Sequence, residues 1–137
     1  MRQISIYNLW LGNARDGRNS CTLLDAGILA VIDLALEEPP AALVRELSYC
    51  CFPLVDGAGN PNWLLRAAVE TVAAFVRADV PTLVCCGAGM SRAPAVAAAA
   101  IASVRGCTLA EALPLVVASG SGDVSPALLA ELKTALS

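Results

Sequence analysis

Hydrophobic residues in this chain form short runs of strand length, separated by longer segments in which they recur at helical spacing. Residues 28–32 (Ile-Leu-Ala-Val-Ile) are an unbroken apolar run, which is typical of a strand buried on both faces of a sheet. Between Leu64 and Val76, apolar residues lie three or four apart and define one face of an amphipathic helix. Strands that alternate with helices predict an α/β fold with a mostly parallel central sheet flanked by helices. We expect strands over 4–7, 9–11, 28–32, 49–54 and 82–85.

Capping residues predict where the helices begin. Asn60 is suited to the cap of a helix, because the asparagine side chain accepts from free backbone N–H groups. Pro61 is suited to the first helical position, where the backbone N–H that proline lacks would have no partner within the helix. Thr108 and Glu111 have the spacing of a capping box, in which each side chain binds the other's backbone N–H. We expect helices over 20–26, 39–46, 60–78, 93–104, from Thr108 onward and over 126–136, and a flexible loop at 119–123.

The length and composition restrict the class of protein. A chain of 137 residues fits one domain, 1–137, that buries a core without disulfides or a metal. The longest apolar run, 93–102, is shorter than a bilayer requires, although 57% of the residues are hydrophobic. The first residues lack the apolar core of a secretory signal, so we expect a cytoplasmic protein. The net charge of −3 and the single lysine, Lys133, argue against nucleic acid or an anionic membrane as the main partner.

The chain contains no histidine, which limits its possible chemistry. A Ser-His-Asp triad, a Cys-His pair and a histidine-ligated metal are all excluded. The six cysteines lack the spacing of a zinc site, and most are expected to be buried small hydrophobic residues. Any reaction must therefore use Cys, Asp, Glu, Arg, Ser and backbone groups.

The segment 86–92, Cys-Gly-Ala-Gly-Met-Ser-Arg, is the strongest candidate for a functional site. It joins a predicted strand to a predicted helix, so that Cys86 lies at the carboxyl end of the strand and the loop leads into a helix amino terminus. Backbone N–H groups and the helix dipole favour an anion at this point, and the same field stabilises a nucleophilic thiolate. The guanidinium of Arg92 presents paired donors suited to two oxygens of a phosphate. The alternative is a buried cysteine near a capping arginine, which the loop glycines make less plausible.

A thiolate that attacks a phosphate ester requires an acid for the leaving oxygen and a base for the later water. Asp56 is the first candidate because it follows a strand end in a glycine-containing loop, and Asp33 is the second. Either could instead be an ordinary turn residue. Ser91 could hold the loop or simply cap the helix, and Arg15 and Arg18 could meet the substrate or be solvated charges.

A further hypothesis concerns oxidation of the nucleophile. Cys85 adjoins Cys86, but neighbours in sequence rarely form an unstrained disulfide. Cys50 or Cys51, on another predicted strand, could pair with an oxidised Cys86 and protect it.

The segment 84–94, Val-Cys-Cys-Gly-Ala-Gly-Met-Ser-Arg-Ala-Pro, resembles the signature loop of cysteine-based protein tyrosine phosphatases. It is similar above all to the small dual-specificity phosphatases, whose loop reads Val-His-Cys-x-Ala-Gly-x-Ser-Arg-Ser-Pro. The resemblance extends over nearly the whole chain. Residues 6–14 are similar to the opening strand of that group, 27–34 to its next strand, and 53–56 to the segment that carries its general acid.

The resemblance implies a role for each matching residue. Cys86 would attack phosphorus and form a phosphocysteine, and Asp56 would protonate the leaving oxygen and then activate water. Arg92 and the loop N–H groups would hold the phosphate, and this preorganised cradle would be the main source of catalysis. The phosphate-binding positions would be Gly87, Ala88, Gly89, Met90, Ser91 and Arg92, and the resemblance implies no metal and no cofactor.

Two positions depart from the family pattern. Cys85 replaces the histidine before the nucleophile, and Ala93 replaces the hydroxyl residue after the arginine. That hydroxyl donates to the departing thiolate, and a charge-assisted hydrogen bond is worth roughly 1.5–3 kcal/mol. Its loss is therefore expected to slow turnover about tenfold or more.

Phosphorylated proteins are the expected substrates. Gly87, Ala88 and Met90 bring no positive charge, whereas a multiply phosphorylated lipid or a nucleotide would require additional cations. A compact chain favours a shallow pocket, open to phosphotyrosine and to phosphoserine or phosphothreonine. Two other functions remain open: a pseudophosphatase module that binds phosphate without turnover, and a rhodanese-type sulfurtransferase, in which Asp56 has no evident role.

Overall fold

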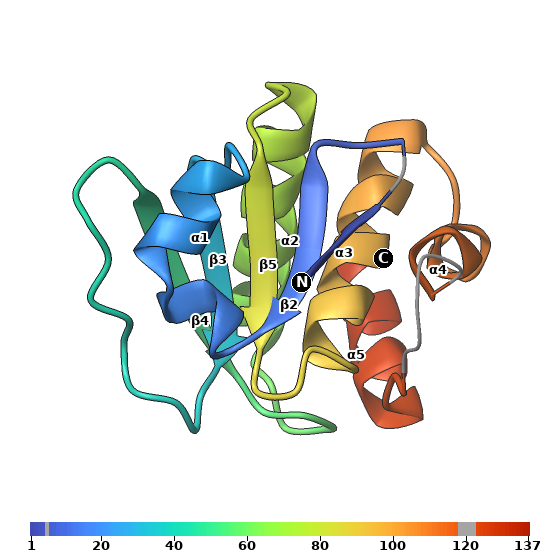
Figure 1. Ribbon diagram of the computed structural model, residues 1–137. Coiled ribbons are helices and arrows are strands. Elements are labelled where there is room, and N and C mark those ends of the chain that lie inside the picture. The colour runs from blue at the N-terminus through green and yellow to red at the C-terminus, as the bar shows by residue number, and fades with distance from the viewer. Residues whose placement is uncertain (5, 118–122) are drawn as a thin grey trace.

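The computed structural model describes residues 1–4, 6–117 and 123–137. Within these residues, five strands form one sheet in the order β1-β2-β5-β3-β4 (Figure 1). β1 is antiparallel to β2, and the other neighbours are parallel. The prediction of an α/β fold with a mostly parallel sheet is confirmed. The strands are β1 (Arg2–Ile4), β2 (Leu9–Asn13), β3 (Ala30–Ala35), β4 (Ser48–Leu54) and β5 (Thr82–Cys86).

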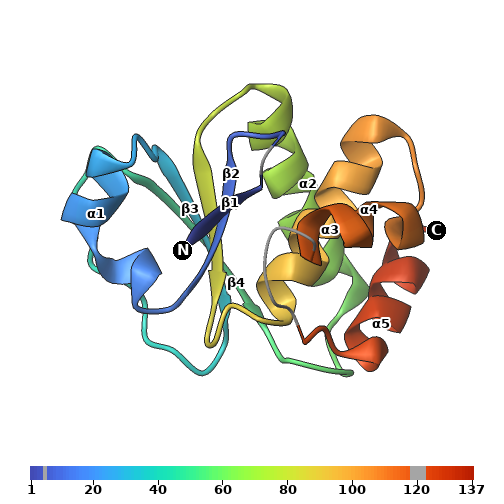
Figure 2. The ribbon, with the colours of Figure 1, turned by 45° about the vertical axis from the view of Figure 1, so that its right-hand side comes forward.

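Helices cover both faces of the sheet, but unequally. The short helix α1 and the 3-10 turn η1 lie on one face, whereas the longer helices form a layer on the other (Figure 2). Because the parallel strands end at the same edge of the sheet, the loops that follow them meet there. The helical elements are η1 (Asp16–Arg18), α1 (Ser20–Asp25), α2 (Asn62–Arg77), α3 (Arg92–Arg105), α4 (Leu109–Val117) and α5 (Pro126–Leu136).

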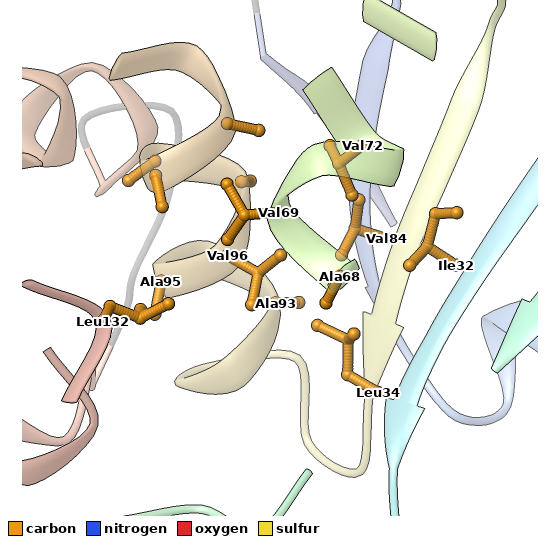
Figure 3. Packing of buried hydrophobic residues seen from close by; sticks show 14 of the residues in the cluster. Ile32, Leu34, Ala68, Val69, Val72, Val84, Ala93, Ala95, Val96 and Leu132 are labelled. Carbon is orange, nitrogen blue, oxygen red and sulfur yellow. The ribbon is translucent and has the colours of Figure 1, made fainter. Parts of the chain in front are cut away.

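The main hydrophobic core surrounds α3. Every residue from Arg92 to Ala102 is buried, because the helix contacts the sheet, α2, α4 and α5. A helix enclosed on all sides is apolar all round, and its alanines let the neighbouring helices approach closely. Figure 3 shows Val84 of β5 and Leu34 of β3 facing α2, while Ala95 faces Leu132 of α5.

Two sequence-based predictions of secondary structure are wrong. The segment 39–46, predicted as a helix, contains no helix and runs without regular structure until the turn before β4. Pro39 precedes another proline, which disfavours the helical backbone there. Side chains bind the extended segment instead, since Ser20 accepts from Val44 N and the Tyr49 hydroxyl accepts from Ala41 N. The first strand ends at Ile4, and 6–8 form a turn rather than the continuation predicted to residue 7.

The predicted helix starts have mixed outcomes. The capping box is confirmed, because Glu111 accepts from Thr108 N and Thr108 Oγ1 accepts from Glu111 N. Ser125 caps α5, the helix predicted over 126–136, through a bond from Leu128 N to its hydroxyl. Asn60 does not cap α2, which begins at Asn62, and binds the preceding loop instead.

Other boundaries move by one to three residues, mainly at β3. Of the loop predicted over 119–123, residues 119–122 lie outside the described residues. No helix in the described ranges is both long and apolar enough to cross a membrane.

Candidate active site

Cys86 is the last residue of β5 and lies at the edge of the sheet where the parallel strands end. Its side chain is buried, with 2% exposure, and belongs to the core on the α3 face. Cys85 points to the opposite face, because side chains alternate along a strand. The loop 87–91 then leads directly into α3, whose first residue is Arg92. The structure therefore brings Cys86, the loop amides and a helix amino terminus together, as the sequence predicts.

Gly89 is required by the shape of this loop. Its φ is +75°, which side-chain-bearing residues rarely adopt, and a Cβ placed there would lie 2.7 Å from the backbone oxygen of Gly12. The loop is also joined to the segment after β2, since Ala14 N donates to Gly87 O at 3.2 Å. These contacts hold the loop against β2.

The guanidinium of Arg92 is buried at the start of α3 and connects the ends of two strands. Nη1 donates to the backbone oxygen of Leu54 at 2.9 Å, at the end of β4. Nη1 and Nη2 also donate to the two oxygens of Glu37, just beyond β3, at 2.6 and 2.5 Å. Within the described residues, Arg92 Nε is a buried nitrogen without a hydrogen-bond partner. A buried, unpaired donor on a cation is a suitable contact for an oxyanion.

Glu37 is a site residue that the sequence analysis missed. The hydrogen bond from Arg92 holds the pKa of Glu37 at about 2, well below the ordinary value of 4.5. The same contact raises the pKa of Arg92, so the pair is fully ionised. Gly87 makes the approach possible, since a Cβ there would lie 2.6 Å from Glu37 Oε2. Its position in the sequence could have indicated this role, because Glu37 follows closely after β3, a strand that neighbours β5.

The structure brings Asp56 to the Cys86 loop. Asp56 is exposed in the loop after β4, and Ser91 Oγ donates to its Oδ1 at 2.6 Å. Ser91 occupies the cap position of α3 without making a side-chain capping bond. Its hydroxyl accepts from Ser125 N at 3.0 Å instead. Ser91 therefore joins the candidate acid to the loop.

Asp33, the second candidate acid, lies elsewhere. It is buried inside β3 and pairs in register with Cys85, so its side chain points to the face opposite Cys86. Its oxygens accept from Ala35 N at 3.1 Å and from the Tyr49 hydroxyl at 2.6 Å. Burial and this hydrogen bond raise the pKa of Tyr49. The geometry gives Asp33 a structural use.

The candidate arginines occupy the turn after β2. Arg18 donates to Pro39 O and lies 3.8 Å from the carboxylate of Glu38, so it holds the segment after β3. Arg15 is exposed just before η1.

The strand order opposes the disulfide hypothesis. β3 separates β4 from β5, so Cys50 and Cys51 lie two strands away from Cys86. Two strand spacings amount to roughly 10 Å, beyond the limit of about 7 Å between the Cα atoms of a disulfide. Cys85 packs against Gly17 on the face of the sheet opposite Cys86. Burial there raises the pKa of the Cys85 thiol, which makes it a poor nucleophile.

Comparison with known proteins identifies the fold. The chain matches no protein-family model and no curated protein sequence. It superposes on the crystal structure of human DUSP28 with a TM-score of 0.84 and 24% identity, covering 98% of this chain and 94% of that chain. The human tyrosine phosphatase-like serine/threonine/tyrosine-interacting protein superposes with a TM-score of 0.82 and 20% identity, covering 98% of this chain and 93% of that chain. The crystal structure of PTPMT1 superposes with a TM-score of 0.76 and 21% identity, covering 98% of this chain and 92% of that chain.

The chain therefore has the fold of the dual-specificity phosphatases. The resemblance seen in the segment 84–94 is confirmed for the fold.

Proposed function

We propose that residues 1–137 form a cysteine-dependent phosphatase domain that hydrolyses phosphate monoesters in proteins, on tyrosine and on serine or threonine. The observation that carries the proposal is the convergence of three groups at one sheet edge. Cys86 ends β5, and Asp56 is bonded to Ser91 of the loop that follows. Arg92, at the start of α3, has a buried Nε without a hydrogen-bond partner among the residues that the structure describes.

In the first step, the Cys86 thiolate attacks phosphorus, so a P–S bond forms and the bond from phosphorus to the leaving oxygen breaks. Protonated Asp56 gives its proton to that oxygen. In the second step, water attacks phosphorus while Asp56 takes one of its protons, and the P–S bond breaks to release phosphate and the thiolate. Arg92 and the loop N–H groups stabilise the charge on the equatorial oxygens in both steps. No metal or cofactor takes part.

The loop rim supports a phosphoprotein substrate. Ala88 and Met90 are exposed and uncharged, and Arg18 is already bonded to the segment after β3. A single phosphate is thus met by one buried guanidinium and backbone amides, and the exposed loop positions Ala88 and Met90 add no cation for a multiply phosphorylated ligand. We also propose a cytoplasmic location for the protein.

The absence of a hydroxyl at Ala93 favours a second candidate function, a phosphate-binding module with little or no turnover. The ion pair with Glu37 points the same way, since it offsets part of the charge that Arg92 offers to an anion. One structural neighbour is named a tyrosine phosphatase-like serine/threonine/tyrosine-interacting protein.

The test is hydrolysis of a small aryl phosphate by the wild type, Cys86→Ser and Asp56→Asn. We expect wild-type turnover, its abolition in the first variant, and a loss of about a hundredfold or more in the second, since general acid catalysis contributes roughly 10²–10⁴-fold. Activity that survives Cys86→Ser would refute the mechanism. Oxyanion binding without turnover would favour the binding module, and transfer of sulfur from thiosulfate would favour the sulfurtransferase.

A further inference from the structure

The loop that carries Asp56 has little intrinsic rigidity. Gly57 and Gly59 have φ of +129° and +106°, and among the described residues no atom beyond the adjacent positions lies within 4 Å of a Cβ placed on either. Glycines in open space fluctuate unless the backbone is bound by other groups. The position of Asp56 therefore depends on the hydrogen bonds that its loop makes.

Asn60 supplies the internal bonds of the loop. Its Oδ1 accepts from Val55 N at 2.8 Å, and its Nδ2 donates to Val55 O at 3.0 Å and to Gly57 O at 3.2 Å. Asn60 itself is buried, with 7% exposure. These bonds close 55–60 into a compact ring, but they do not attach the ring to the rest of the protein.

Glu131 of α5 provides the attachment from 71 and 72 residues away in sequence. One carboxylate oxygen accepts from Gly59 N at 2.7 Å, and the other accepts from Asn60 N at 3.2 Å and from Asn60 Nδ2 at 3.3 Å. The bond from Gly59 is the largest of the causes that lower the pKa of Glu131, so the carboxylate is ionised at neutral pH.

The amino-terminal end of α5 is attached to the Cys86 loop as well. Ser125 N donates to Ser91 Oγ, and Asp123 N donates to Met90 O at 2.7 Å. Ser91 Oγ in turn donates to Asp56. The contacts form a closed circuit from the acid loop through Glu131 to α5, from α5 to the Cys86 loop, and back to Asp56.

We propose that Glu131 is a positioning residue for proton transfer, which acts through Asn60 and the backbone of 59–60 to hold Asp56 beside the Cys86 loop before substrate arrives. This inference rests on the proposed phosphatase function. Its consequence is selective in the first chemical step: displacement of an acid by about 1 Å can cost on the order of a hundredfold, and there only where the leaving oxygen requires a proton.

The experiment compares Glu131→Gln and Glu131→Ala with the wild type on two substrates. The leaving group of phenyl phosphate is a weakly acidic phenol that needs protonation, whereas para-nitrophenyl phosphate releases a far more acidic phenol. We expect kcat/KM for phenyl phosphate, which reports the steps up to phosphoryl transfer to Cys86, to fall about tenfold to a hundredfold in Glu131→Ala, and less in Glu131→Gln, which keeps one acceptor. The value of kcat/KM for para-nitrophenyl phosphate should change little. Glu111→Gln is the matched control, since Glu111 also accepts from a backbone N–H but at the start of α4.

Amide hydrogen exchange at 59 and 60 gives a second readout that does not depend on turnover. Exchange should accelerate in both Glu131 variants and stay unchanged in Glu111→Gln. Unchanged exchange, or equal losses of kcat/KM on both substrates, would overturn the inference. If the wild type shows no turnover while exchange responds as expected, the phosphatase function fails and the attachment of the loop stands.

Discussion

The ion pair between Glu37 and Arg92 gives the sharpest prediction about stability. Glu37→Gln preserves the shape of the side chain but leaves one acceptor where Arg92 has two donors, so an amide N–H₂ then faces an N–H. A charge-assisted hydrogen bond is worth about 1.5–3 kcal/mol. The Glu37 side chain is 54% exposed, whereas that of Arg92 is 7% exposed, so water screens part of this energy. We expect a destabilisation of about 1–2 kcal/mol near neutral pH.

The effect of pH has a definite sign. The folded protein holds the pKa of Glu37 at about 2, below its ordinary 4.5, so the ionised carboxylate stabilises the fold. That contribution is complete above about pH 4.5 and is lost as the pH falls through about 2. The stability difference between wild type and Glu37→Gln should therefore be constant around neutral pH and shrink in acid.

Urea unfolding at a series of pH values measures this difference directly. Glu38→Gln is the matched control, because its carboxylate lies 3.8 Å from Arg18 in a pair of which both side chains are about one-third exposed. Such a surface pair is worth little, and we expect a change within about 0.5 kcal/mol. If the two variants behave alike, or if the effect of Glu37→Gln persists unchanged in acid, the reasoning about the ion pair is wrong.

Two further substitutions test the loop. Gly89→Ala should destabilise the protein by more than Gly106→Ala and abolish activity, as thermal unfolding and an aryl phosphate assay would show. Both positions have similar φ, +75° and +72°, and a left-handed backbone costs a residue with a side chain about 1–2 kcal/mol. Of the two, only Gly89 has backbone atoms with which a Cβ would collide. Ala93→Ser should raise kcat about tenfold by restoring a donor to the departing thiolate, while Ala97→Ser one turn later should not; steady-state kinetics that show equal effects would contradict the role assigned to residue 93.

Local patterns were sufficient to predict most of the fold. The apolar run at 28–32 and the helical spacing from Leu64 to Val76 reflect burial against neighbours, which periodicity records directly. The candidate loop could also be predicted from the sequence, because Cys86 and Arg92 lie within one strand–loop–helix unit. The failure at 39–46 has a different origin: its backbone is bound by Tyr49 and Ser20, and no local pattern reveals such partners.

The supporting contacts of the site could not be predicted for the same reason. Glu37 reaches Arg92 across 55 positions, and Glu131 reaches Gly59 across 72. Such pairs arise only once the strand order β5-β3-β4 and the placement of α5 are fixed. Asn60 shows how one residue can mislead, since the side chain that suits a helix cap binds the acid loop. Pairing between distant polar groups depends on tertiary structure, which hydrophobic periodicity does not encode.

Rapid quenching during aryl phosphate turnover, followed by mass spectrometry of the peptide that contains Cys86, tests the central proposal most directly. The Cys85→Ala background removes the neighbouring thiol, so a phosphate found on a cysteine of this peptide lies on Cys86. We predict a phosphocysteine there that appears and decays with turnover and is absent from Cys86→Ser. Turnover that proceeds without phosphate on Cys86 would contradict the proposed mechanism.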